Sequence, residues 1–190
     1  MILGLTGKNA AGKGEVAAYL KTKGFIYYSL SDELREEAAK RSLEHLRGNL
    51  ISLGNELREQ NGPECLARKI NEKIRNDKKK DNNKNFVVDS IRSPFEAKEL
   101  LKNGDFLLIG IDAPVGLRFQ RVVERNRVGD AKTIEEFKKQ EDRENTKNET
   151  SQQLNETFKL AGKAVINNGS LESLHKKIDE LLEGLSKAKI

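Results

Sequence analysis

The sequence predicts an α/β protein with three layers, in which helices cover both faces of a five-stranded parallel sheet. Its 190 residues suit a single domain of this kind. Five short apolar runs alternate with segments of helical periodicity, which is typical of parallel strands joined by helical crossovers. A glycine-rich turn at 7–14 joins the first run to the first helix. In such sheets the ligand lies beyond the carboxyl ends of the strands.

The expected strands are the apolar runs at 2–6, 25–29, 86–90, 106–112 and 164–167. Helical patterns cover 12–23, 31–79, 94–102, 115–126 and 133–145, with a short helix before 159 and a last one over 170–185. Gly24 should close the first helix, and the long helical segment should break at Gly48 and at 61–63. The polar stretch 76–85 should form a surface turn.

These elements predict one domain over 1–190, with a core made of 1–30, 84–126 and 146–190. The region 31–79 has too few apolar residues for a core of its own. We therefore expect it to be a helical insertion at one edge of the sheet that binds an acceptor molecule. Residues of about 127–145 should form a short lid.

Composition limits the classes of partner. Basic residues number 35 and acidic residues 30, so the net charge of +5 is small, and aromatic residues are only 5% with no Trp. Base-stacking platforms need aromatic side chains, so nucleic acid is not expected as the main partner. Cys65 has no second cysteine to pair with, and His45 and His175, both expected on exposed helix faces, lack zinc-ligand spacing. The first apolar run is too short for a signal or a membrane helix, so we expect a cytoplasmic protein without membrane contact.

The turn after the first strand has the spacing G-x-x-x-x-G-K, in the strand-to-helix context that a phosphate-binding loop requires. Small residues there let backbone N–H groups surround phosphate oxygens, and the helix start adds its positive dipole end. Lys13 would contact the β- and γ-phosphates and stabilise charge during transfer. The expected nucleotide-binding residues are Gly7, Lys8, Asn9, Ala10, Ala11, Gly12, Lys13, Gly14 and Glu15.

The loop resembles that of adenylate kinases and related nucleoside monophosphate kinases, which reads G-x-x-x-x-G-K-G-T. Gly14 matches the glycine of that family, whereas Glu15 stands where its threonine would be. The resemblance implies the P-loop NTPase fold, ATP as phosphoryl donor and Mg²⁺. Because Gly14 removes the hydroxyl that commonly helps hold Mg²⁺, water and a carboxylate elsewhere must hold the ion.

Two further segments are similar to the acceptor side of adenylate kinases. In "SLSDELR" (29–35), Asp32 would cap a helix, and Arg35 would reach the acceptor phosphate; a plain cap and a surface arginine are the alternative. In "FVVDSIRSP" (86–94), Asp89 would hold Mg²⁺ through water and orient it, and Arg92 would contact the acceptor. An alcohol acceptor would need a base, for which Asp32 is the candidate.

"LRFQRVVERNR" (117–127) carries Arg118, Arg121 and Arg125 on one helix face, with Arg127 just past the helix end. Like charges on one face repel, so the cluster implies an anion or carboxylates beside it. Phosphoryl transfer needs such cations, and we expect Arg121 and Arg125 to be catalytic. Arg143 is a candidate second arginine of the lid.

The tail "VINNGSLESLHKKIDELL" (165–182) resembles the closing strand, turn and helix of dephospho-CoA kinases. The resemblance implies that Asn168, with Asn167 and Gly169, lies near the adenine ring; a structural turn explains these residues as well. Taken in order of elements, the whole chain resembles the P-loop nucleotide kinase superfamily, between adenylate kinase and dephospho-CoA kinase.

The main prediction is a phosphotransferase, a kinase that moves the γ-phosphoryl group of ATP to a nucleotide or nucleotide-like small molecule, of nucleoside monophosphate kinase or dephospho-CoA kinase type. It should act as a monomer or homodimer. An alternative is a nucleotide-gated ATPase acting on an RNA or protein partner, which the isoelectric point of about 9.2, the lysines of 76–84 and Glu15 favour. A third is a non-catalytic nucleotide-binding module.

Overall fold

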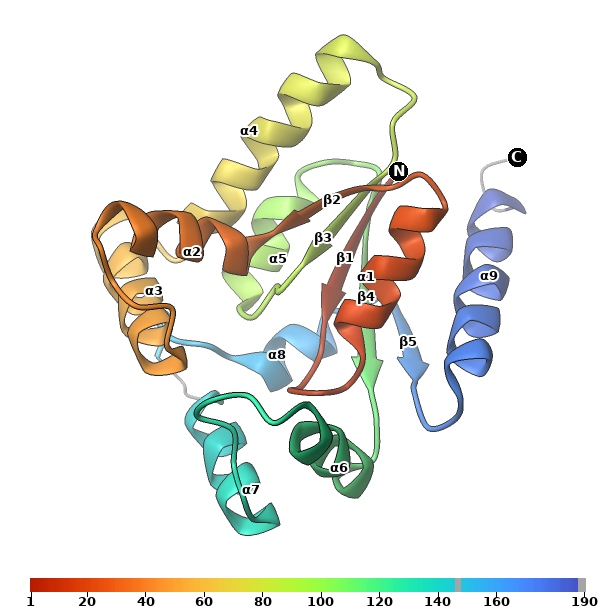
Figure 1. The fold of residues 1–190 in the computed structure, drawn as a ribbon. Helices are drawn as coiled ribbons and strands as arrows, with labels where there is room; N and C mark the ends of the chain where they lie inside the picture. Colours follow the sequence, from red (N-terminus) through yellow and green to blue (C-terminus); the bar gives the residue numbers. More distant parts are fainter. Residues whose placement is uncertain (146–147, 188–190) are drawn as a thin grey trace.

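The computed structural model describes residues 1–145 and 148–187. A single parallel sheet of five strands, in the order β2-β3-β1-β4-β5, forms the centre of these residues (Figure 1). The strands are β1 (Ile2–Thr6), β2 (Ile26–Ser29), β3 (Phe86–Asp89), β4 (Phe106–Asp112) and β5 (Lys163–Ile166). The helices are α1 (Lys13–Thr22), α2 (Leu30–Lys40), α3 (Arg47–Asn61), α4 (Cys65–Lys80), α5 (Pro94–Leu101), α6 (Val115–Arg125), α7 (Ile134–Arg143), α8 (Leu154–Lys159) and α9 (Leu171–Lys187).

Helices cover both faces of the sheet, as the alternation of strands and helices predicts. On one face α1 and α9 pack against side chains such as Leu3, Leu5 and Ile111, all fully buried (Figure 1). On the other face α2 to α5 pack against Phe86 and Val88, also fully buried. Burial of apolar side chains on both faces is what a wholly parallel sheet requires. The expected three-layer α/β/α fold is therefore confirmed.

The helical insertion uses the same core as the sheet. Leu30 of α2, Leu53 of α3 and Ile70 of α4 belong to one buried cluster with Phe86 and Val88 of β3. Helix α2 follows the end of β2, and both α2 and α3 pack against that cluster, so they lie beside the carboxyl edge of the sheet. A smaller cluster, made of Val122, Ala131 and Phe137, joins α6 to α7 at the same edge.

The strand register brings the loops after the strands together. Ile2 at the start of β1 is paired with Phe86 of β3 and with Phe106 of β4, and Ser29 at the end of β2 is paired with Asp89. Asp89 and Asp112 close their strands. The segments that follow β1, β2, β3 and β4 therefore emerge at one edge of the sheet, where the predicted ligand site lies.

Two expected boundaries in the helical insertion are wrong. Gly48 lies inside α3, near its start, where the first N–H groups of a helix have no partner within the helix and glycine costs little. The break lies at 41–46 instead, where Ser42 has a φ of 55°. The expected surface turn 76–85 is also wrong in its first half, because α4 continues to Lys80.

The polar end of α4 is helical because its charged side chains have partners on β2 and in the turn just before β4. The Tyr28 hydroxyl donates to Asp77 over 2.8 Å, and burial together with Asp77 raises the pKa of Tyr28 to about 12. Lys78 pairs with Asp105 at 2.9 Å. Tertiary contacts therefore override a composition that favours a turn.

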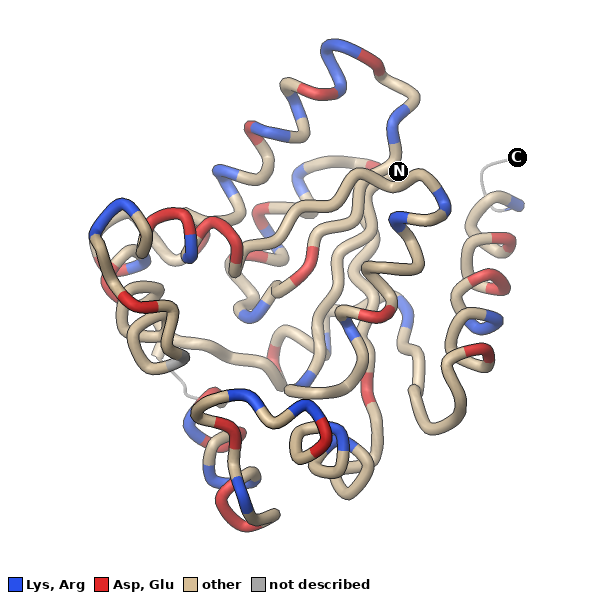
Figure 2. Tube along the Cα trace, viewed as in Figure 1, with Lys and Arg blue, Asp and Glu red and all other residues tan. Residues whose placement is uncertain are grey.

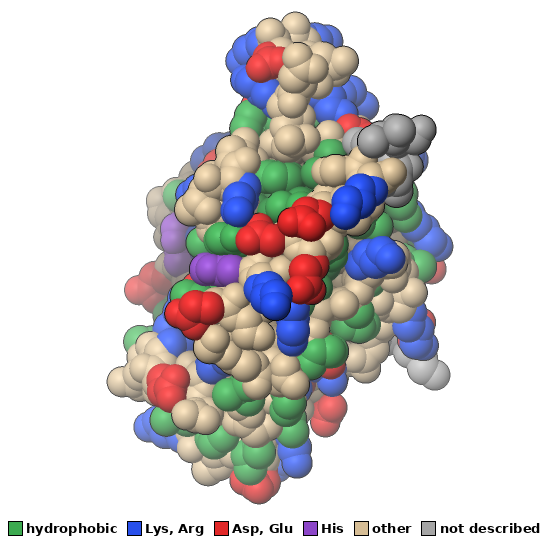
Figure 3. All heavy atoms as spheres, turned by 90° about the vertical axis from the view of Figure 1, so that its right-hand side faces the viewer, with side chains coloured by type: hydrophobic (Ala, Val, Ile, Leu, Met, Phe, Trp, Pro, Cys, Tyr) green, Lys and Arg blue, Asp and Glu red, His purple; other side chains and the backbone are tan. Residues whose placement is uncertain are grey.

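The two histidines also differ from expectation. His45 is exposed but lies in the loop 41–46 rather than on a helix. His175 on α9 is half-buried, and its ring stacks on that of Tyr19 with centroids 3.8 Å apart. On the side of the molecule that carries α9, acidic and basic side chains are interspersed (Figure 3). Along α4, basic residues predominate over acidic ones (Figure 2). No helix within 1–145 or 148–187 is long and apolar enough to span a membrane.

Candidate active site

The loop between β1 and α1 requires glycine at two positions. Gly7 has a φ of 143°, and a Cβ there would lie 2.0 Å from the backbone oxygen of Ile111. Gly12 has a φ of 109°, and a Cβ there would lie 2.2 Å from the Asn167 side chain. The loop is therefore pressed against the ends of β4 and β5. Only glycine allows such an approach at a positive φ.

Asn167 fixes the loop from the far end of the chain. Its side chain is 6% exposed and donates to Ala11 O over 2.9 Å, and its backbone N–H donates to Asp112 O over 2.7 Å. Asn167 therefore ties the loop to the end of β4, and its contact with a base stays a prediction. Asn168, the expected nucleotide-binding residue of this turn, is exposed, and its oxygen accepts from Lys177 over 3.3 Å. Its contact with the base stays a prediction.

The ammonium group of Lys13 lies against the backbone of the phosphate loop. Its Nζ donates to Gly7 O over 2.7 Å and to Lys8 O over 3.0 Å. Burial lowers the pKa of Lys13 to about 8, Asp89 and Glu144 act to raise the pKa, and Arg92 and Arg118 act to lower it. Two carboxylates and two guanidinium groups therefore act on the lysine that is expected to contact the phosphates. Glu144, at the end of α7, is 5% exposed and belongs to no motif in the sequence.

Asp89 closes β3, the strand next to the central β1. It is 9% exposed, and its Oδ1 accepts from the N–H of Ser90 over 2.6 Å. Ser90 has a φ of 65°, which is uncommon for a serine and is typical of functional sites that store backbone strain. This turn brings the chain sharply from the strand into the acceptor side of the site.

The arginine face of α6 contacts the phosphate loop. Two of the three arginines on this face are paired with carboxylates. Arg118, 3% exposed, pairs with Glu141 of α7 and donates to Asn9 O over 3.4 Å. Arg125 makes two bonds to Asp130, of 2.7 and 2.8 Å. The sequence implied either an anion or carboxylates beside the arginine face. The carboxylates of Glu141 and Asp130 are present there, at positions that the sequence did not indicate.

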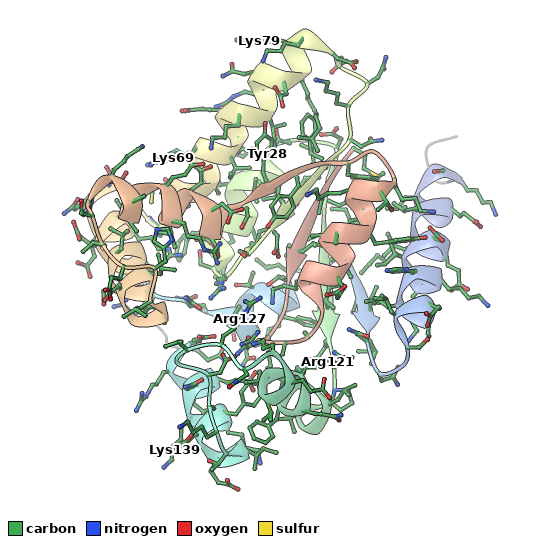
Figure 4. All side chains as sticks on the ribbon, viewed as in Figure 1. Tyr28, Lys69, Lys79, Arg121, Arg127 and Lys139 are labelled. Carbon is green, nitrogen blue, oxygen red and sulfur yellow. The ribbon has the colours of Figure 1, made fainter. Side chains whose placement is uncertain are left out.

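Arg121 and Arg125, the expected catalytic arginines, both reach the loop. Arg121 donates to Ala10 O over 3.3 Å and to Asn167 O over 3.2 Å. Arg125 donates to the Asn9 side-chain oxygen over 3.2 Å. Arg121 and Arg127 lie at the end of the sheet where the phosphate loop faces α6 (Figure 4). Their catalytic role stays a prediction, as does that of Arg143, which is exposed at the end of α7.

A cavity of about 240 Å³ opens beside the loop and is rich in arginine. Arg35 and Arg92, the expected acceptor-binding residues, both line it, together with Arg125. Two arginines that sequence reasoning did not assign to the acceptor line it too, namely Arg58 and Arg127. Its apolar wall is made by Leu30, Leu34, Leu50, Ile51, Leu66 and Val128. We call this space the acceptor cavity.

Asn9 connects the loop to the acceptor cavity. Because its Oδ1 accepts from Arg125, its Nδ2 is the donor end, and this atom is buried without a partner in the described part of the chain. A buried N–H with nothing to bond to costs about 1–3 kcal/mol, so such groups in native proteins call for an explanation. An anion in the cavity would satisfy it.

Asp32 does not line the acceptor cavity. It pairs with Arg35 at 2.6 Å, and both side chains are 46% exposed. The expectation that Asp32 caps its helix is wrong, because α2 begins at Leu30 with Ser29 in the cap position. The contact observed for Asp32 is its ion pair with Arg35, which orients the Arg35 side chain. The role of Asp32 in binding an acceptor stays a prediction.

Arg58 is the main residue that the sequence did not reveal. It is 4% exposed and pairs at 2.8 Å with Glu96, which is fully buried. Glu96 also accepts from the backbone N–H groups of Arg92, at 2.8 Å, and Ser93, at 3.1 Å, within the capping box of α5. Arg58 therefore anchors the backbone that carries Arg92. Nothing in the helical pattern around position 58 signals a partner 38 residues away.

The donor set for Mg²⁺ is small. A Cβ at Gly14 would meet nothing within 4 Å, so no packing excludes a hydroxyl there. Glu15 is exposed on the first turn of α1. The described residues contain no group of three His, Cys, Asp or Glu side chains that could hold a metal. Mg²⁺ usually keeps several waters and binds one or two carboxylates plus substrate phosphates, and Asp89 fits that role.

These features define a class. The site combines a phosphate-binding loop after the central β1, an arginine-rich helix over this loop and a basic cavity beside it. Together these features are typical of P-loop nucleotide-binding proteins with the fold of small-molecule kinases. The AAA-domain family model matches residues 6–138. A UPF0200 protein of Pyrococcus abyssi is 35% identical over 185 residues, covering 96% of this chain and 95% of the relative. The chain therefore belongs to the UPF0200 family. A UPF0200/UPF0201 protein of Archaeoglobus fulgidus is also 35% identical, over 98% of this chain and 56% of its own longer length.

Solved structures support the fold assignment. The dephospho-CoA kinase of Campylobacter jejuni aligns over 100% of this chain and 98% of its own, with a TM-score of 0.59 and 18% identity. The shikimate kinase of Aquifex aeolicus aligns over 98% of both chains, with a TM-score of 0.51 and 19% identity. The resemblance to P-loop kinases is thus confirmed for the fold. At this identity it does not extend to a substrate.

Proposed function

We propose that the protein is a kinase that transfers the γ-phosphoryl group of ATP to a small nucleotide or nucleotide-like acceptor. The observation that carries this proposal is the acceptor cavity. Five arginines line it against a single acidic side chain, Asp130, and it adjoins the phosphate loop through Asn9. An ATPase that acts on water needs no such second basic site. A kinase does, because it must hold two anionic molecules in line.

In this proposal each group of residues has a separate task. The backbone of 7–14 and Lys13 hold the donor phosphates. Arg35 and Arg92 hold the acceptor anion, for which the planar guanidinium is suited. Arg121 and Arg125 stabilise charge on the transferred group when the lid, 127–145, closes. A phosphate acceptor is already ionised, so its oxygen attacks without a dedicated base. Asp89 would hold Mg²⁺ through water, and the bound ion would neutralise phosphate charge.

The test is a coupled assay for ADP with ATP, Mg²⁺ and a panel of nucleoside monophosphates and dephospho-CoA. We expect ADP release to depend on one of these acceptors. The variant Lys13→Ala should lose at least about 100-fold in kcat/KM because it removes a charge aimed at the transition state. A matched control is Lys176→Ala, a lysine exposed on α9, which should leave the rate unchanged. ATP binding without acceptor-dependent ADP would overturn the proposal.

A second candidate, an ATPase acting on RNA or protein, is favoured by one observation. Lys69 and Lys79 are exposed on α4 and point away from the acceptor cavity (Figure 4). Such a basic helix would bind RNA through its phosphates, with a steep dependence on salt. ATP hydrolysis stimulated by RNA and lost in Lys69→Glu with Lys79→Glu, without any small acceptor, would favour this candidate.

A further inference from the structure

A second cavity continues from the acceptor cavity and differs from it in chemistry. It measures about 480 Å³ and lies between α3, the loop after α6 and the end of α7. Ile51, Val128 and Gln152 line both cavities, so the two are neighbouring compartments. The larger compartment is also lined by Leu46, Asn55, Gln140, Arg143 and Glu144. We call it the distal compartment. It has one arginine among its lining residues, against five in the acceptor cavity.

Two amide oxygens of the distal compartment are buried without a partner. Asn55 Oδ1 and Gln140 Oε1 have no hydrogen bond in the described part of the chain. The orientation of Gln140 is fixed, because its Nε2 donates to Gly129 O over 3.2 Å. Its oxygen is therefore a true acceptor. These two residues approach from opposite sides, one from α3 and one from α7.

Apolar side chains make much of the remaining wall. Leu46 is 45% exposed and Val128 is 88% exposed. An exposed valine alone needs no explanation, but here it stands with Leu46 and Ile51 around a cavity large enough for a small ligand. The two charged residues that also line the compartment, Arg143 and Glu144, are of opposite sign. The wall therefore suits a largely apolar group without net charge, whereas the five arginines of the acceptor cavity suit an anion.

We propose that the distal compartment holds the heterocyclic base of the acceptor, whose N–H groups donate to Gln140 Oε1 and Asn55 Oδ1. The acceptor is then a nucleotide with its phosphate among the arginines and an N–H-bearing base between α3 and α7. This inference rests on the proposed function and adds the two residues that determine specificity. A base without N–H groups would leave both oxygens buried and unpaired, and sites of that kind discriminate strongly.

The experiment measures Kd by calorimetry in the presence of a non-hydrolysable ATP analogue. The probes are AMP, CMP and GMP, each compared with a counterpart in which the base N–H groups are methylated, and ribose 5-phosphate, which has no base. We expect at least one monophosphate to bind tenfold or more tightly than its methylated counterpart and than ribose 5-phosphate. In Gln140→Leu and in Asn55→Leu that preference should fall to about twofold or less, with the affinity for ribose 5-phosphate unchanged.

The matched control is Gln60→Leu. Gln60 is exposed on α3 and contacts Glu56 at 3.0 Å, so this variant should keep the full preference. Equal loss for all probes in Gln140→Leu and Asn55→Leu would overturn the inference, as would an unchanged preference in both or the absence of any preference. Failure of the proposed function is distinguishable. A preference that depends on Gln140 without acceptor-dependent ADP contradicts only the kinase activity, and phosphoryl transfer without that preference contradicts only the inference.

Discussion

The two halves of the site, which we propose hold the phosphoryl donor and the acceptor, are built in different ways. In the phosphate loop, Gly7 lies against the backbone of Ile111 and Gly12 against the Asn167 side chain, both at a positive φ. Each arginine of the α6 face also donates a hydrogen bond to the loop. The acceptor half has two adjoining cavities and, among the described residues, two buried amide oxygens without partners, in Asn55 and Gln140. The difference indicates that the donor half is rigid before any ligand binds, whereas the acceptor half is completed by its ligand. Three predictions test this contrast, from the largest effect to the smallest.

The largest effect is expected for Gly7→Ala. Its Cβ would lie 2.0 Å from Ile111 O, which is backbone and unable to move aside. Strain and overpacking together should lower the free energy of unfolding by about 4 kcal/mol or more and abolish ATP binding. Urea unfolding and calorimetry measure the two effects. Gly14→Ala is the matched control in the same loop, since its Cβ meets nothing within 4 Å; a similar loss in both variants would refute the rigidity of the donor half.

A smaller combined effect on stability and ATP binding is expected for Arg58→Met, on the acceptor half, because ATP binding should be kept. The variant leaves the fully buried Glu96 without its ion pair, and removing one partner of a buried pair costs about 3–5 kcal/mol. The double variant Arg58→Met with Glu96→Gln should recover part of that loss in urea unfolding. ATP affinity should be unchanged in both variants, and acceptor affinity should fall because Glu96 holds the Arg92 backbone. A weakened ATP affinity would show that the two halves are not separate.

The smallest effect concerns Lys13 and pH. Burial lowers its pKa in the folded protein to about 8 from the ordinary 10.5. The unfolded chain therefore binds more protons between these values, and stability should rise as pH increases from about 8 toward 10.5. In the proposed function the Lys13 ammonium holds the donor phosphates, so the affinity for ATP should fall up to about tenfold between pH 8.5 and 9.5. Calorimetry across this range measures it, and Lys13→Arg, which stays charged, should remove the dependence. If the ATP affinity of the unsubstituted protein does not change over this pH range, the pKa of Lys13 does not lie near 8.

The same contrast explains what the sequence revealed. The strands, the loop and the approximate bounds of most helices follow from local patterns, because apolar periodicity and glycine spacing act over a few residues. The acceptor half depends on side chains that meet across long separations, such as Arg58 with Glu96. Two predictions in this half were wrong, the cap at Asp32 and the break at Gly48. Ser29 occupies the cap position of α2, and the break lies beyond Lys40, where Ser42 has a positive φ. Asn55 and Gln140 stand out only once burial and unpaired atoms are known.

The tie made by Asn167 has a consequence for synthesis of the protein. Ala11 and Asn167 are 156 residues apart, yet their hydrogen bond and the adjoining bond from Arg121 shape the nucleotide cradle. A nascent chain that has not yet released β5 from the ribosome has the glycine motif without its clamp. In the proposed function, a chain that still lacks the segment after β5 would bind ATP weakly, so ATP affinity would report that this segment has been synthesised and has folded against the loop.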